Sequence, residues 1–206
     1  MKLYTFLPSP NSLRVCAVAN QMGIELEIVP VDLSKGEHLE SEFLALNPNH
    51  KIPTLVDGDF VLWESTAIML YLAYQSGRLI PKEPRERARM HQWISWNNAH
   101  MGPACGMLLF ENLVKKLLNL GQPDPEQIKK GNQEFARYAQ VLNDYLKGRG
   151  QLVGNTVTVA DHHVVASFVH AESAAMPVDA YPELQRWCGE MLATPPWQSA
   201  LSALKA

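Results

Sequence analysis

The residues with the clearest chemical potential lie in the segment 49–72. Ile52 precedes Pro53, which favours an extended backbone at Ile52, and an X-Pro bond in a tight turn can be cis. A backbone kinked at this point turns one N–H and one C=O outward. Glu64 and Ser65 begin an apolar helix, whose unpaired N–H groups and positive dipole end attract carboxylates. Ser65 alone is more often a simple N-cap, but together these features predict a site for a small peptide-like ligand.

An alternation of strands and helices must position these residues. Strands are predicted at Leu3–Leu7, Leu26–Val31, Thr54–Val56 and Phe60–Trp63. The last two form a hairpin across Asp57-Gly58-Asp59. Helices are predicted at Ser12–Met22, Ser34–Leu46 and Ser65–Ser76, from the spacing of their apolar residues. This alternation favours a mixed α/β domain.

The chain after the proline-containing segment 79–84 is predicted to be helical. Two prolines and mixed charge interrupt the periodic pattern there, which places a domain boundary near residue 82, between domains 1–80 and 86–206. The predicted helices are Arg85–Leu118 with a bend at Gly102-Pro103, Pro125–Lys147, Val159–Glu172, Tyr181–Leu192 and Pro196–Leu204. Thr158 and Asp161 have the spacing of a capping box, with Asp in place of the usual Glu.

Composition excludes several classes of protein. The 206 residues carry 18 basic and 21 acidic side chains and a formal net charge of −3, so nucleic acid is not expected as a partner. No apolar run approaches the roughly 20 residues of a membrane span, and no leader is recognised. The three cysteines have neither C-x-x-C nor metal-ligand spacing, so no metal site is expected and the predicted location is the reducing cytoplasm.

The combination of Ile52-Pro53 before a strand pair with the Glu-Ser-x-Ala-Ile helix start at residues 64–68 resembles soluble glutathione transferases. The resemblance covers essentially the whole chain. It implies an N-terminal thioredoxin-like domain in the order βαβαββα, followed by an all-helical domain. Residues 9–11 and 49–53 are most similar to bacterial nu-class and other serine- or threonine-type members.

The resemblance implies that the ligand is the tripeptide glutathione, a co-substrate with two carboxylates, an ammonium and a thiol. A thiol with a pKa of about 8.5 is only slightly ionised at pH 7. Lowering this pKa by about two units requires roughly 2.7 kcal/mol, and one hydrogen bond to a charged acceptor contributes about 1.5–3 kcal/mol. The family pattern places Ser9 at the thiolate-binding position, with Asn11 as a second candidate and Ser12 as a third. A loop or capping role is the alternative for each residue.

The remaining glutathione contacts follow from the same resemblance. The backbone of Ile52, held by Pro53, would pair with the cysteinyl part of the ligand. Glu64 would bind the ammonium, and Ser65 would bind the γ-glutamyl carboxylate through charge-assisted bonds. The glycyl carboxylate needs a further donor, for which the candidates are His38, His50 and Lys51.

The electrophile is expected between the two domains. Its predicted walls are Leu7, His100, Met101, Ala104 and Met107. Methionine adapts to varied apolar shapes, which suits a permissive site. Ordinary core packing is the alternative for each of these residues.

These expectations describe a cytoplasmic, homodimeric glutathione transferase that acts in detoxification by presenting the glutathione thiolate to small hydrophobic electrophiles. One alternative is a glutathione-dependent disulfide reductase or a peroxidase that acts on hydroperoxides at the same site. Another alternative is a non-catalytic binding module of the same fold. Modules of this kind need not retain Ser9, Ile52-Pro53 and Glu64-Ser65 together, whereas this chain has all of them.

Overall fold

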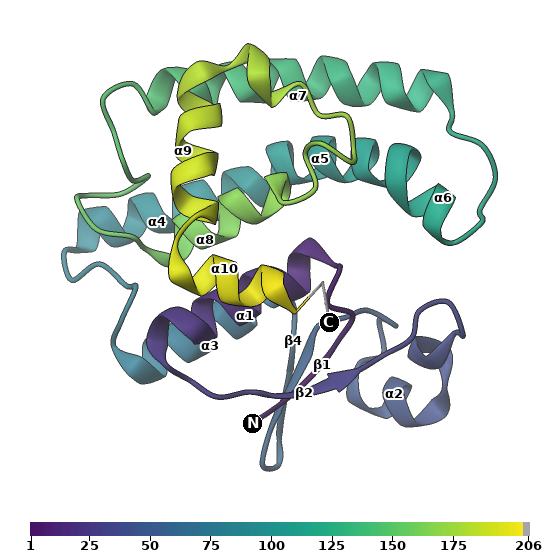
Figure 1. Ribbon diagram of the computed structural model, residues 1–206. Helices are drawn as coiled ribbons and strands as arrows, with labels where there is room; N and C mark the ends of the chain where they lie inside the picture. The colour runs from purple at the N-terminus through teal and green to yellow at the C-terminus, as the bar shows by residue number, and fades with distance from the viewer. Residues whose placement is uncertain (204–206) are drawn as a thin grey trace. The chain divides into compact units, whose positions relative to one another are not determined.

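The computed structural model describes residues 1–203, which divide into two compact units (Figure 1). The first unit comprises Met1–Ile80 and the described residues from Thr194, and the second comprises Pro81–Ala193. The division after Ile80 falls in the segment 79–84, where the sequence predicts a boundary. The residues from Thr194 differ, because they belong with the first unit and not with the predicted domain 86–206.

Four short strands form a mixed sheet in the first unit, in the order β2-β1-β3-β4. They are β1 (Lys2–Thr5), β2 (Glu27–Pro30), β3 (Thr54–Asp57) and β4 (Phe60–Trp63). β1 and β2 are parallel, whereas β3 is antiparallel to both of its neighbours, β1 and β4. A parallel pair needs a crossover connection, which α1 (Pro10–Met22) provides. The predicted order βαβαββα is confirmed.

The helices of this domain begin and end where local chemistry directs. α1 starts at Pro10, a residue suited to the first helical position, and ends at Gly23, whose φ of 72° lets its N–H donate to the last carbonyls. The single helix predicted over Ser34–Leu46 is wrong. The Asp32 carboxylate accepts bonds from the N–H groups of Ser34 and Lys35 and forms a turn, so only η1 (Glu37–Leu39) and α2 (Ser41–Leu46) are helical. The remaining helix of this domain is α3 (Ser65–Ser76).

The last helix, α10 (Pro195–Ser202), packs against α1 within the first unit. The carboxamide of Asn20 on α1 donates to the carbonyl of Pro196 at 3.2 Å. Trp197 is fully buried and Ala200 nearly so, which explains why this helix stays with the first unit. The predicted helix ran to Leu204, which lies outside the described residues.

The second unit is all-helical, as predicted. Its α-helices are α4 (Pro84–Trp96), α5 (Gly102–Leu109), α6 (Lys115–Leu117), α7 (Pro125–Tyr145), α8 (Val159–Val165) and α9 (Pro182–Leu192). The π-helical segments are η2 (Asn97–Met101) and η3 (Phe110–Val114), and the 3₁₀ segments are η4 (Ala166–Phe168) and η5 (Val178–Ala180). The helix predicted over Val159–Glu172 is therefore shorter than expected and narrows to a 3₁₀ turn before it ends.

The predicted bend near Gly102 is a π-helical turn in the path from α4 to α5. The N–H of Gly102 donates to the carbonyl of Asn97, five residues earlier. A Cβ atom at position 102 would lie 2.7 Å from that oxygen, so this close approach requires glycine. A second π turn, η3, joins α5 to α6.

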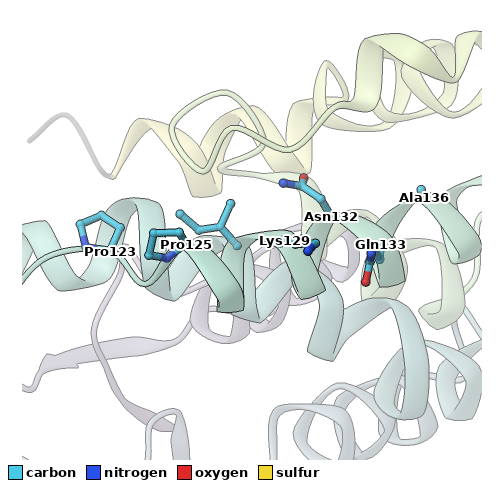
Figure 2. A pocket seen from close by; sticks show the side chains of 7 residues that line it. Pro123, Pro125, Lys129, Asn132, Gln133 and Ala136 are labelled. Atoms are coloured by element: carbon cyan, nitrogen blue, oxygen red, sulfur yellow. The ribbon is translucent and has the colours of Figure 1, made fainter.

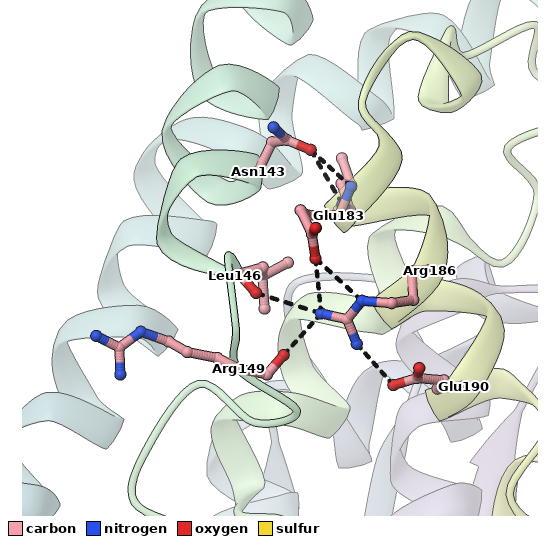
Figure 3. A network of polar contacts seen from close by, with 7 residues as sticks. Asn143, Leu146, Arg149, Glu183, Arg186 and Glu190 are labelled. Carbon is pink, nitrogen blue, oxygen red and sulfur yellow. Dashed lines mark hydrogen bonds and ion pairs between the residues drawn. The ribbon is translucent and has the colours of Figure 1, made fainter.

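Polar side chains fasten the helices of the second unit at their ends. The predicted capping box of Thr158 and Asp161 is present at the start of α8. Arg186 on α9 donates to the carbonyls of Leu146 and Arg149 at 3.2 and 2.7 Å, beyond the end of α7 (Figure 3). Asn143 on α7 accepts a bond from the N–H of Glu183 in the first turn of α9. α7 and α9 therefore cap each other.

The three cysteines are buried free thiols. No helix among residues 1–203 is long and apolar enough to cross a membrane. Within the same residues, no group of three or more His, Cys, Asp or Glu side chains could hold a metal ion.

Candidate active site

The register of the sheet brings three of the predicted segments to one edge. Tyr4 of β1 pairs with Thr54 of β3, and Thr54 pairs with Trp63 of β4. The loop that leads to Ser9, the Ile52-Pro53 turn and the Glu64-Ser65 helix start therefore all leave this edge, within one or a few residues of a paired position. Neighbouring strands lie roughly 4.8 Å apart, so these segments begin within about 10 Å of one another.

Ser9 is the N-cap of α1. Its Oγ accepts a hydrogen bond of 3.3 Å from the N–H of Asn11. A hydroxyl that accepts through a lone pair keeps its own proton available for donation. The positive end of the 13-residue helix α1 also lies at this residue. Ser9 can therefore donate to an anion while it still caps the helix.

The other two candidates near Ser9 differ in exposure. Asn11 is exposed, and its backbone N–H is the donor that Ser9 accepts. Ser12 has no exposed surface, and its Oγ is buried without a hydrogen-bond partner. In this conformation a ligand can reach Asn11, but it cannot reach the hydroxyl of Ser12.

The turn before β3 has the predicted kink. The Ile52-Pro53 bond is cis, and His50 has a φ of 58°. Buried Asn47, which is not among the predicted site residues, is bonded to the backbone of this turn. Its buried carboxamide could have been suspected from its place two residues before a turn, because Asn commonly bonds nearby backbone groups.

The Glu64-Ser65 helix start also has unusual backbone geometry. Glu64 is the N-cap of α3 with φ 70° and ψ 110°, and its side chain makes no capping bond. Its exposed carboxylate is therefore not used for capping. Burial lowers the pKa of Arg14 on α1 to about 10, and the charge of Glu64 opposes this shift. Ser65 is the first residue of α3 and is 6% exposed, so most of its surface is buried.

The candidates for a second carboxylate contact lie in two loops of the first unit. His38 is in η1, half-buried, with its Nδ1 out of solvent. His50 and Lys51 are exposed in the turn before Ile52. The side chains of His50 and Lys51 therefore reach solvent, whereas one ring nitrogen of His38 is buried.

The residues predicted to contact the electrophile differ in their exposure to solvent. His100 is exposed and stacks on Tyr138, with 5.0 Å between ring centroids, and Met107 is half-buried. Met101 and Ala104 are 0% and 3% exposed, so they are core residues in this conformation. Leu7 lines a hollow of about 770 Å³ between α1, β2 and α10 of its own unit.

A second hollow, of about 670 Å³, lies on the first half of α7 (Figure 2). Its lining residues are Pro123, Pro125, Ile128, Lys129, Asn132, Gln133 and Ala136. None of the residues that the sequence predicts to bind glutathione or an electrophile is among them. This hollow is therefore not part of the candidate active site.

Comparison with known proteins identifies the family. Residues 1–74 match the family model for the glutathione S-transferase N-terminal domain, and residues 99–195 match that for the C-terminal domain. Glutathione S-transferase 3 of Zea mays is 36% identical over 99% of this chain and 94% of its own length. Glutathione S-transferase D6 of Drosophila melanogaster is 33% identical over 100% of this chain and 94% of its own length.

A solved structure agrees with these matches. The crystal structure of a glutathione transferase from Pseudomonas putida, with one glutathione disulfide bound per subunit, superposes with a TM-score of 0.88. It is 27% identical to this chain and covers 97% of it, and the match spans 90% of the Pseudomonas chain. The chain therefore belongs to the glutathione S-transferase family and is a glutathione transferase.

Proposed function

We propose that the chain is a serine-type glutathione transferase in which the Ser9 hydroxyl donates to the glutathione thiolate. The observation that carries the proposal is the hydrogen bond from the Asn11 N–H to Ser9 Oγ at 3.3 Å. This bond orients the hydroxyl and leaves its proton for the sulfur. The helix dipole at the same residue favours the anion further. The Asn11 side chain, exposed beside it, is the second proposed donor.

The other contacts proposed for glutathione follow the sheet edge. The backbone of Ile52 pairs with the cysteinyl unit, and Pro53 fixes the turn. Glu64 binds the ammonium through its carboxylate, which is exposed and makes no capping hydrogen bond to α3. Ser65, in the first turn of α3, binds the γ-glutamyl carboxylate through its N–H and hydroxyl.

The second carboxylate of glutathione needs a cationic or hydrogen-bonding partner. His38, His50 and Lys51 are proposed for the glycyl end, because they lie in the loops that lead to and from α2. Replacing each residue in turn and measuring the KM for glutathione identifies the partner.

The electrophile is proposed to be a small hydrophobic molecule that contacts the second unit through His100 and Met107, both of which have exposed surface. Met101 and Ala104 are buried in the core and are therefore not proposed as contacts. Leu7 remains a sequence-based prediction. Because a Pseudomonas relative holds glutathione disulfide, a substrate panel should include disulfides and hydroperoxides beside aryl halides.

A two-fold homodimer is proposed, in which α3 of one subunit meets the second half of α4 of the other. Exposed aromatic side chains on and beside α3 suit such an interface, since Trp63 is 39% and Tyr74 52% exposed. Light scattering at micromolar concentration checks the mass. The relatives from Zea mays and Drosophila melanogaster give no support to the finer assignment to the bacterial nu class. Only the serine type is therefore proposed.

The test of the proposed function is the titration of bound glutathione. The ultraviolet absorbance of the thiolate is followed against pH in the wild type and in Ser9→Ala. Loss of one charge-assisted bond should raise the pKa of the bound thiol by about one to two units, while glutathione affinity changes little. An unchanged titration in Ser9→Ala, with a larger rise in Asn11→Ala, would assign the principal role to Asn11.

A further inference from the structure

A buried carboxamide organises the turn that leads to Ile52. Asn47 is 2% exposed, and its Nδ2 donates to the carbonyl of Lys51 at 2.7 Å and to the Thr54 hydroxyl at 3.2 Å. Its Oδ1 accepts from the backbone N–H of Asn49 at 3.0 Å and from the side chain of Asn49 at 3.1 Å. Both hydrogens and both lone pairs of the carboxamide are therefore used.

We propose that Asn47 is a positioning residue that fixes the direction of the Ile52 N–H, the donor that binds the cysteinyl unit of glutathione. This inference rests on the proposed function and adds to it a residue that does not touch the ligand.

The peptide unit between Lys51 and Ile52 links the Asn47 carboxamide to the Ile52 N–H. A trans peptide is planar, with its C=O and N–H pointing in opposite directions. The chain's one cis peptide bond among the described residues is the next one, Ile52-Pro53. When Asn47 holds the Lys51 carbonyl from one side, the Ile52 N–H must point away from Asn47. Among the described residues no hydrogen bond from this N–H is found, so it remains available as a donor.

The backbone of the same residue bonds the middle of the turn. The backbone carbonyl of Asn47 accepts from the N–H of His50 at 3.1 Å, and His50 has a φ of 58°, a conformation that is uncommon outside glycine. Such a residue persists where its surroundings determine it. The Asn47 side chain holds this turn at Asn49 and Lys51, and its backbone carbonyl holds it at His50. A turn held in this way is preorganised, so glutathione does not have to order it on binding.

The experiment compares two variants of Asn47 with a matched control. Asn47→Ala removes the whole carboxamide. Asn47→Asp keeps the acceptor for Asn49 but cannot donate to the Lys51 carbonyl, which separates the two halves of the network. Asn143→Ala is the control, because Asn143 is also buried and also bonds backbone N–H groups, those of Glu183 and Leu184 in the second unit.

Calorimetric titration with glutathione is the first readout. Both Asn47 variants should raise the Kd about tenfold, with kcat at saturating glutathione nearly unchanged. Asn143→Ala should keep the wild-type Kd within about twofold, although its resistance to unfolding falls. Equal affinity in the folded Asn47 variants, or the same loss in Asn143→Ala, would overturn the inference.

A second readout does not need a variant to fold. In the wild type, hydrogen exchange of the Ile52 amide should slow on glutathione binding by more than tenfold, and an unprotected Ile52 amide in the complex would overturn the inference. Failure of the wild type to bind glutathione would refute the proposed function itself. Wild-type binding with unaffected Asn47 variants would refute only the role of Asn47.

Discussion

Replacing Asp161 with alanine should destabilise the second unit strongly. The carboxylate is fully buried at the start of α8, where Oδ1 accepts the N–H of Leu152 at 2.8 Å. Oδ2 accepts the N–H and the hydroxyl of Thr158 at 2.8 and 2.9 Å. The hydroxyl can turn to another acceptor, but the two amides cannot. Asp161→Ala therefore leaves two buried N–H groups without an acceptor.

The magnitude follows from those two amides. A buried donor that loses its partner costs about 1–3 kcal/mol, so the variant should lose about 2–6 kcal/mol of unfolding free energy. Domains typically have about 5–15 kcal/mol in total, and the variant should therefore be close to unfolding at 37 °C. Asp161→Asn should lose less, because its remaining oxygen can still accept from one of the two amides.

The loss should also depend on pH. Burial is the largest influence on the pKa of Asp161 and raises it to about 6. An acid whose pKa is higher in the folded state than in the unfolded state, here about 6 against 3.8, loses stability as pH rises through this window. This difference corresponds to about 3 kcal/mol. The gap between the wild type and Asp161→Ala should thus be larger at pH 4.5 than at pH 7.

Urea unfolding followed by tryptophan fluorescence measures these differences. Asp144→Ala is the matched control, because Asp144 is an aspartate of the same unit whose side chain is 49% exposed. An exposed ion pair contributes little, so this control should change stability by less than about 1 kcal/mol. A loss in Asp161→Ala no larger than that of Asp144→Ala would refute the reasoning about buried amides.

Two further predictions concern the same unit. Burial lowers the pKa of His162 from 6.5 to about 4. The unfolded state therefore binds the proton more readily than the folded state. About 3 kcal/mol of unfolding free energy from this group should be lost as the pH falls from about 6.5 to 4. The unfolding free energy of His162→Leu should therefore rise relative to that of the wild type as the pH falls through this window. A difference between the two proteins that stays constant with pH would contradict the prediction. Arg186→Lys should lower the unfolding free energy by about 1–2 kcal/mol, because a lysine cannot bond the carbonyls of Leu146 and Arg149 together with two carboxylates. A salt concentration of about 1 M should remove less than half of this difference between the wild type and the variant.

Much of the fold could be predicted because local signals and the global pattern agree. The end of the first helix at Met22, the hairpin across Asp57-Gly58-Asp59 and the capping box at Thr158 each depend on a local signal, and each is found where predicted. The prediction of one helix over Ser34–Leu46 was wrong because the apolar residues there follow the helical period only weakly. The Asp32 carboxylate competes with the helix for the N–H groups at its start.

Tertiary contacts explain the features that the sequence did not predict. α10 follows α9 directly in the chain, and only the burial of Trp197 and its packing against α1 show that it belongs with the first unit. The π turns are likewise invisible in the spacing of apolar residues, although Gly102 marked one of them as a bend. Asn47 was not predicted for a similar reason. An asparagine before a proline is typical of a helix end, and only the tertiary structure shows the four groups that its carboxamide bonds.

The candidate site depends on strand register more than on any one side chain. Tyr4, Thr54 and Trp63 lie side by side across three strands, and each functional segment lies within a few residues of one of these paired residues. A slip of one residue in β3 would turn Leu55, which is fully buried, to the opposite face of the sheet. Burial of Leu55 against the helices therefore fixes the register, and the register places Ile52 between the loop of Ser9 and the helix start at Ser65. The apolar core thus determines the alignment of the polar groups that are proposed to bind glutathione.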